Sequence, residues 1–122
     1  MVAFVEMDEK VSLQAQLGDT GGPIVLINKF TVKSEEANQL VQAWAEDAAW
    51  MKRQAGFIST QLHRGIAGST VFLNYAVWES TAHFRAAFAN PEFQGKLTHY
   101  PSSAVASPHL FRKVAVPGIC VE

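Results

Sequence analysis

Cysteine is almost absent from this 122-residue chain, because Cys120 stands alone. An internal disulfide needs two cysteines and a thiolate-rich metal site needs several, so both are excluded. The four histidines are isolated in the sequence and form no HxH or HxxxH pattern with a carboxylate cluster, so no metal site is predicted. The chain also lacks a Gly-rich turn between a strand and a helix, which nucleotide cofactors require. We therefore expect neither a metal nor a cofactor.

An excess of charge of one sign is also missing. Ten Lys and Arg residues stand against eleven Asp and Glu residues, and the net charge is −1. The basic residues are scattered, whereas nucleic acids and anionic membranes select a concentrated basic surface. No run approaches the ~20 apolar residues of a membrane span, and residues 1–10 carry three acids where a signal peptide carries positive charge. We expect a cytoplasmic protein that binds neither nucleic acid nor membrane.

The length fits one domain with a single core. Residues 1–22 mix short apolar and acidic pieces and lead into Asp19-Thr20-Gly21-Gly22-Pro23, whose composition is typical of a loop. This change predicts an N-terminal arm over 1–22 and a folded domain over 23–122. The arm packs on a partner subunit or is loosely ordered, and the pattern leaves both open.

Hydrophobic periodicity predicts the order strand, helix, strand, strand, helix, strand. A Gly-containing hairpin over 65–69 makes the second and third strands antiparallel neighbours. Ser34 and Ser80 are suitable N-caps, Gly56 ends the first helix, and Pro91 separates a short helix from the second. The order is that of a ferredoxin-like βαββαβ fold of the α+β class, with an antiparallel sheet and helices on one face. The predicted strands are 23–32, 57–64, 70–78 and 108–116, and the predicted helices are 35–54, 81–89 and about 92–97, with a polar connection over 98–107.

Two tryptophans differ in their place on the predicted 35–54 helix. Trp44 lies on the apolar stripe with Leu40, Ala48 and Met51, which favours core packing. Trp50 falls off that stripe, so we expect it to meet a second subunit or the rim of a cavity.

The strand over 70–78 is apolar on both faces, although helices cover only one face of such a sheet. A second copy of the same sheet would bury the other apolar face without any further element. We therefore expect a homodimer.

Two amides interrupt the apolar stripes of the strands. Asn28 shares a face with Phe30, and Asn74 shares a face with Phe72 and Trp78. A buried amide without a partner costs about 1–3 kcal/mol. Either the two amides bond across neighbouring strands while Trp78 fills the core, or all three side chains serve a ligand.

Four segments resemble the antibiotic-biosynthesis monooxygenase superfamily of dimeric α+β barrels, over about residues 23–116. These segments are Ile27-Asn28-Lys29-Phe30-Thr31-Val32, Gln54-Ala55-Gly56-Phe57, Asn74-Tyr75-Ala76-Val77-Trp78-Glu79-Ser80 and Phe84-Arg85.

The pattern is most similar to the cofactor-independent anthrone oxygenases of aromatic polyketide pathways. The resemblance implies a monooxygenase that uses O₂ to turn an anthrone-like or polycyclic phenolic substrate into a quinone. It implies Asn28, Asn74 and Trp78 as catalytic hydrogen-bond donors, with a hydrophobic aromatic substrate held by Phe30, Phe72, Phe84 and Phe88.

The sequence departs from that branch at Phe84, where some members carry a Tyr thought to move protons. The general base stays open among His63, His83, His99 and Tyr75, although Tyr75 lies on the face opposite Asn74.

Two further functions stay open. One is a non-catalytic or differently catalytic barrel that binds a hydrophobic metabolite. The other is haem binding or degradation. The haem-degrading branch has a pocket Trp and an iron-ligating His, but this chain has Ala87 and Leu97 at those two positions. His99, two residues further on, points ~200° away on a helix.

Overall fold

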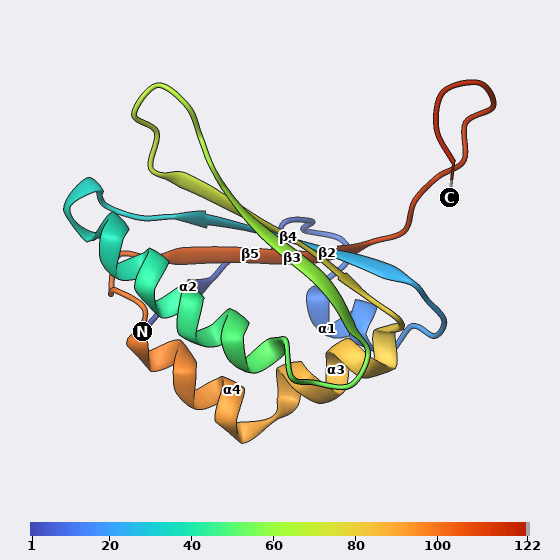
Figure 1. Cartoon of the computed structure of the whole chain (residues 1–122), viewed down its shortest axis with the longest axis horizontal. Helices are drawn as coiled ribbons and strands as arrows, with labels where there is room; N and C mark the ends of the chain where they lie inside the picture. Colours follow the sequence, from blue (N-terminus) through green and yellow to red (C-terminus); the bar gives the residue numbers. More distant parts are fainter. Residues whose placement is uncertain (122) are drawn as a thin grey trace.

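A five-stranded sheet of order β1-β5-β2-β4-β3 organises the chain in the computed structural model, which describes residues 1–121. The four long strands pair antiparallel, and the two-residue β1 adds to the edge parallel to β5. The expected ferredoxin-like α+β fold is confirmed (Figure 1). The strands are β1 (Ala3–Phe4), β2 (Ile24–Thr31), β3 (Phe57–Arg64), β4 (Val71–Trp78) and β5 (Val105–Phe111).

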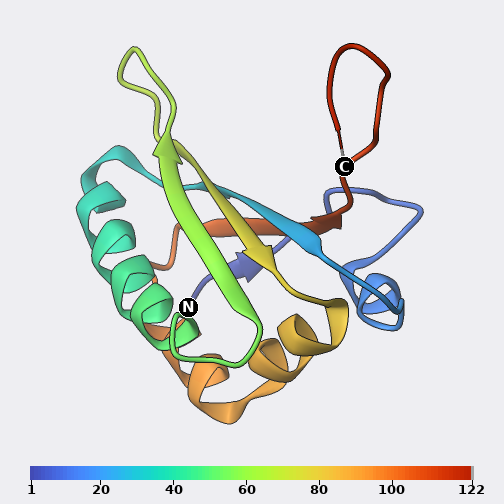
Figure 2. The ribbon, with the colours of Figure 1, turned by 45° about the vertical axis from the view of Figure 1, so that its right-hand side comes forward.

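Helices α2 (Ala37–Met51), α3 (Thr81–Ala89) and α4 (Pro91–Lys96) lie together on one face of the sheet (Figure 2). Local chemistry sets several of their ends. The Ser80 hydroxyl accepts a hydrogen bond from the His83 backbone N–H at 3.1 Å, and the Asn90 side chain accepts one from the Glu92 N–H at 2.9 Å. The chain turns after α2 at Gly56, whose φ of 85° is one that glycine adopts without strain.

The first long helix begins differently from the prediction. No side-chain cap bond forms at Ser34; the chain enters α2 through a 3₁₀ turn, η1 (Ser34–Glu36). A second 3₁₀ turn, η2 (Leu97–His99), extends α4.

Strand β5 corrects the prediction of a strand over 108–116. Residues 105–111 pair with residues 25–31 of β2, and the pairing stops at Val25 and Phe111, one residue from the start of β2. Pro108 therefore lies in the middle of the strand rather than at its start. β1 pairs only with residues 105 and 106, so on the side away from β2 no strand needs an N–H from Pro108. The alternating pattern of 112–116 is real, but pairing with a neighbour decides which residues form the strand.

Trp50 corrects a second expectation. It is only 4% exposed within its own chain, where its ring stacks on Phe93 of α4 with centroids 6.3 Å apart. Its indole Nε1–H donates to Glu92 Oε2 at 2.8 Å. The short α4 helix supplies this packing surface, and the periodicity of α2 alone carries no information about it. Trp44, expected in the core, is half-buried against the core and faces the cavity described below.

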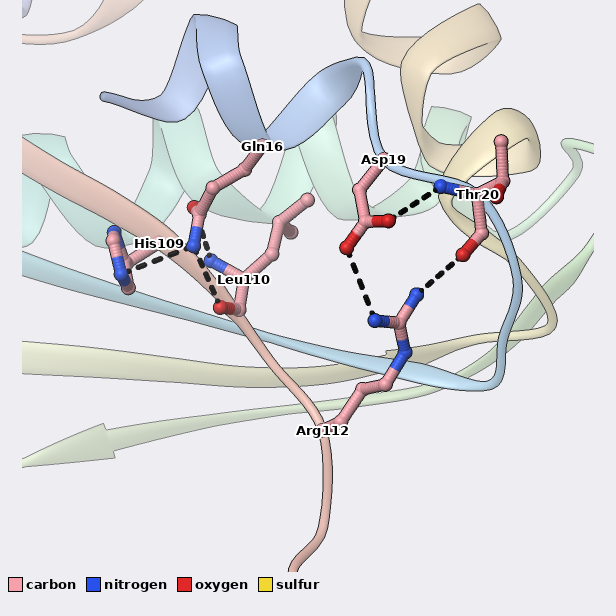
Figure 3. Close-up of polar contacts among 6 residues, drawn as sticks. All are labelled: Gln16, Asp19, Thr20, His109, Leu110 and Arg112. Atoms are coloured by element: carbon pink, nitrogen blue, oxygen red, sulfur yellow. Dashed lines mark hydrogen bonds and ion pairs between the residues drawn. The ribbon is translucent and has the colours of Figure 1, made fainter. Parts of the chain in front are cut away.

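The first 22 residues pack along the edge of the same sheet. Val2 is buried in the core, and β1 hydrogen-bonds to β5. The short helix α1 (Leu13–Leu17) is attached to β5 by Gln16, whose amide donates to the Leu110 carbonyl at 3.0 Å and accepts from its N–H at 2.9 Å (Figure 3). Arg112 then donates to Asp19 Oδ2 at 3.0 Å and to the Thr20 carbonyl. These bonds hold the segment beside β5 over a sequence separation of more than 90 residues.

The face of the sheet opposite the helices has no covering element from α2, α3 or α4. Apolar side chains on the strands remain partly exposed there, including Val71 at 40% and Tyr75 at 38%. The β3–β4 hairpin and the segment after β5 both extend away from the helical layer (Figure 1). Within residues 1–121, no helix has the length and apolar composition that crossing a membrane requires.

Candidate functional site

A cavity lies between the helix-covered face of the sheet and the helices. It holds about 650 Å³ of unfilled space when its open mouth is included. We call this cavity the slot, and the aromatic side chains in its lining suit a flat ring system. Its lining is mainly apolar and includes nine aromatic residues: Phe4, Phe30, Trp44, Phe57, Trp78, Phe84, Phe88, Phe93 and Tyr100.

Asn28 and Asn74 lie opposite each other on neighbouring strands of the cavity floor. They are register partners in the β2–β4 ladder, so their side chains project from the same face. The Asn74 Oδ1 accepts a hydrogen bond of 2.5 Å from the Thr60 hydroxyl, which leaves its Nδ2 as the free donor. The Asn28 Oδ1 is buried and has no partner. Bonding across neighbouring strands thus satisfies the Asn74 oxygen, whereas the Asn28 oxygen is free to accept a hydrogen bond.

Trp78 closes one end of the floor and is 1% exposed. Its indole packs edge-on against Phe57 and Phe84, with centroids 5.5 and 5.7 Å away. The Nε1–H is buried without an acceptor. Buried indole N–H groups usually find a partner, so this donor is unusual in being free to bond to an acceptor.

Three of the four phenylalanines predicted to hold substrate line the cavity: Phe30, Phe84 and Phe88. Phe72 shares their side of the sheet and is 2% exposed, but it is outside the cavity lining. The guanidinium of Arg64 lies 5.0 Å from the centre of its ring. Phe72 therefore packs in the core beside the slot.

An acid that the sequence analysis missed also lines the cavity. Asp47 belongs to the inner stripe of α2 with Trp44, Ala48 and Met51. Its Oδ2 accepts a hydrogen bond of 2.9 Å from the Tyr100 hydroxyl, while its Oδ1 is buried and has no partner. Burial raises the pKa of Asp47 from 3.8 to about 6, against the opposing effects of the Tyr100 hydrogen bond and the Lys96 charge. The sequence does contain a signal for this position: Asp47 follows Leu40 by seven residues and Trp44 by three, and this spacing puts it on the inward-facing side of the helix.

The residues predicted as general bases lie outside the cavity lining. His63 and Tyr75 are exposed, and His83 Nδ1 lies 2.7 Å from the Ser80 hydroxyl at the start of α3. His99 is exposed and pairs with Glu46 at 3.0 Å, so it is directed away from the slot. His109, which the sequence analysis did not single out, contacts the Gln16 amide at 3.1 Å and is also outside the lining.

The site thus combines neutral N–H donors, one carboxylate and an aromatic enclosure. Neutral donors in a water-poor site stabilise an oxyanion, and a carboxylate with a raised pKa accepts a proton near neutral pH. Within residues 1–121, no group of three or more His, Cys, Asp or Glu side chains could hold a metal ion.

Comparison with known proteins identifies the family of the chain. A family model described as antibiotic biosynthesis monooxygenase matches residues 23–95. Deoxynogalonate monooxygenase of Streptomyces nogalater is 31% identical over 88 residues, which are 72% of this chain and 74% of that protein.

Solved structures give the same result. SnoaB, a cofactor-independent oxygenase from Streptomyces nogalater, matches with a TM-score of 0.71 and 27% identity, over 79% of this chain and 97% of SnoaB. A candidate monooxygenase from Shewanella loihica PV-4 matches with a TM-score of 0.65 and 28% identity, over 81% of this chain and all (100%) of that one. The resemblance inferred from the sequence motifs is confirmed. The chain belongs to the antibiotic biosynthesis monooxygenase family and is a monooxygenase.

Proposed function

We propose that this monooxygenase uses O₂ to oxidise an anthrone-like or other polycyclic phenolic substrate to a quinone, with no metal or organic cofactor. One observation carries the proposal: a cavity rich in aromatic side chains contains a buried indole N–H without an acceptor and an amide whose Nδ2 is free. An aromatic oxyanion supplies the acceptor that these donors lack and flat rings for the aromatic lining to pack against. The relatives named deoxynogalonate monooxygenase and cofactor-independent oxygenase support the same class of reaction.

In the proposed reaction the substrate supplies its own electrons. Loss of a proton from the ring methylene gives an electron-rich enolate, which passes one electron to O₂. The Trp78 Nε1–H and the Nδ2 groups of Asn74 and Asn28 donate hydrogen bonds to the oxygens of the enolate, and the Asn28 Oδ1 accepts one from a hydroxyl of the phenolic substrate. The aromatic walls exclude water and keep the flat ring in register with the donors.

The test is O₂ uptake with dithranol as a model anthrone, in metal-free buffer containing a chelator. We expect the wild-type protein to accelerate uptake over buffer. Asn74→Ala and Trp78→Phe each remove one donor, so each should lower kcat on the order of 10²–10³-fold.

The chain offers matched controls for both variants. Asn38→Ala removes an exposed amide of α2, and Trp50→Phe removes an indole that bonds to Glu92 outside the slot. Both controls should keep the wild-type rate. Wild-type uptake no faster than buffer would refute the oxygenase; binding of dithranol without uptake would favour a carrier of hydrophobic metabolites, and a Soret band on adding haem would favour haem binding.

We further propose that a second copy of the chain covers the open face of the sheet, where Val71 and Tyr75 are exposed. Light scattering at micromolar concentration should give twice the 13.4 kDa mass of the chain. A monomeric mass would refute the dimer. We also propose that the protein acts in the cytoplasm, which cell fractionation would test.

A further inference from the structure

Asp47 is an acid placed where the fold otherwise puts apolar side chains. It projects from α2 into the slot between Trp44 and Met51, and the floor across the slot carries Asn28 and Asn74. Burying a carboxylate in such surroundings is unfavourable unless its oxygens are satisfied. One oxygen is satisfied by Tyr100, and the other is not.

Tyr100 fixes the direction of the carboxylate. It is 2% exposed, and its ring is stacked on Phe30 with centroids 5.7 Å apart and an angle of 11° between the planes. The hydroxyl therefore has little freedom, and its 2.9 Å bond holds Oδ2. Oδ1 is left as an oriented, buried acceptor in the cavity lining.

Among the charged groups around Asp47, Lys96 acts on it directly, whereas Glu92, Glu46 and His99 bond to other residues. On the neighbouring α4, Glu92 accepts from Trp50, and the positive charge of Lys96 lowers the pKa of Asp47. Glu46 and His99 pair with each other at the surface. The floor residues that face Asp47 are neutral amides and a hydroxyl: Asn28, Asn74 and Thr60.

We propose that Asp47 is the general base of the reaction and that Tyr100 is the residue that positions it. The inference rests on the proposed function, because it names the group that removes the proton from the substrate. It also explains why no histidine lies in the cavity lining.

Asp47 alone can remove and return every proton that the reaction moves. Asp47 Oδ1 takes the first proton from the ring methylene, and the resulting enolate gives one electron to O₂. The carbon radical and superoxide combine into a C–O bond, and Asp47 returns its proton to the peroxide. Asp47 then takes the second methylene proton while the O–O bond breaks, the carbonyl forms and the departing hydroxide receives that proton as water. One methylene and one O₂ give one carbonyl and one water.

The decisive experiment separates proton removal from oxygenation. Under anaerobic conditions in D₂O, exchange of the dithranol methylene protons is followed by mass spectrometry for the wild-type protein and for Asp47→Asn. The Asn side chain keeps the size of Asp47 and an oxygen for Tyr100, but it is not basic. We expect exchange and aerobic kcat to fall on the order of 10²–10⁴-fold, with KM changed only a few-fold.

The pH profile tests the positioning role of Tyr100. The wild-type kcat/KM should fall below about pH 6 as Asp47 is protonated. The Tyr100 hydrogen bond lowers the pKa of Asp47, so Tyr100→Phe should move this limb to higher pH. A loss of packing alone would lower the rate without moving the limb. Glu46→Gln removes an exposed carboxylate one position along the same helix and should change neither exchange rate nor profile.

Each outcome is informative. If Asp47→Asn exchanges the methylene protons at the wild-type rate and its acid limb is unchanged, Asp47 is not the base. If the wild-type protein exchanges the protons but takes up no O₂, Asp47 is still the base but the protein is not an oxygenase for this substrate. If the wild-type protein does neither, both proposals are refuted. If Asp47→Asn fails to fold by near-UV circular dichroism, the position of the acid limb in Tyr100→Phe decides.

Discussion

Replacing Asn28 by Leu should make the protein more stable and less active. The Asn28 Oδ1 is buried without a hydrogen-bond partner, and an unsatisfied buried acceptor costs about 1–3 kcal/mol. Leu has nearly the shape of Asn and carries no polar atom. We therefore expect the free energy of unfolding to rise by about 1–3 kcal/mol, while kcat for dithranol falls on the order of 10²–10³-fold.

Asn74→Leu is the matched comparison, because Asn74 is the register partner of Asn28. Its Oδ1 accepts from Thr60, so the substitution leaves a hydroxyl without its acceptor. The free energy of unfolding should fall by about 1 kcal/mol. The two substitutions thus lower activity together but change stability in opposite directions, as expected where a functional site retains strained or unsatisfied groups.

The assay is urea denaturation at one fixed protein concentration, followed by circular dichroism, with O₂ uptake measured on the same samples. Equal slopes against urea would show that the unfolding transition is comparable between variants. If Asn28→Leu loses as much stability as Asn74→Leu, the Asn28 oxygen is satisfied in solution and its role as a group kept for ligand is refuted.

Two further predictions concern stability. The pKa of Asp47 is higher in the folded chain than its ordinary 3.8, so protonation of Asp47 stabilises the folded protein. This stabilisation is complete below about pH 4 and is lost as the pH rises through about 6. This pKa difference corresponds to about 3 kcal/mol, so Asp47→Asn should be more stable than wild type by up to that amount at pH 7.5 and nearly equally stable at pH 4. Urea denaturation at both pH values measures the two differences, and an equal stability difference at both pH values would contradict the raised pKa. Trp50→Phe loses the buried bond to Glu92 and should lower the free energy of unfolding by about 1–3 kcal/mol in the same assay, and an unchanged midpoint would show that this bond contributes nothing.

The floor of the site follows from the sequence. Alternation along a strand puts Asn28 and Phe30 on one face of β2, and Asn74 and Trp78 on one face of β4, wherever the strands lie in the fold. The predicted bounds of α3 and β3 are also confirmed, because Ser80 caps the helix and Gly56 provides the turn before β3. Local propensity and periodicity are sufficient for such features.

The rest depends on contacts between distant segments. Strand β5 covers 105–111 because those residues pair with β2, and Trp50 is buried because α4 packs on it. The Asp47–Tyr100 pair joins residues 53 positions apart. No periodicity within α2 indicates that a hydroxyl from beyond η2 will meet its one inward-facing acid.

The sequence by itself determined the fold class, the family and the two amides and indole that face one way, because these depend on short-range spacing and on matched motifs. The tertiary structure decided which of those groups lack partners, and it brought Asp47 to them. Whether a buried polar group is satisfied depends on every segment packed around it, so only the folded chain separates an amide bonded to Thr60 from an oxygen left free for a ligand.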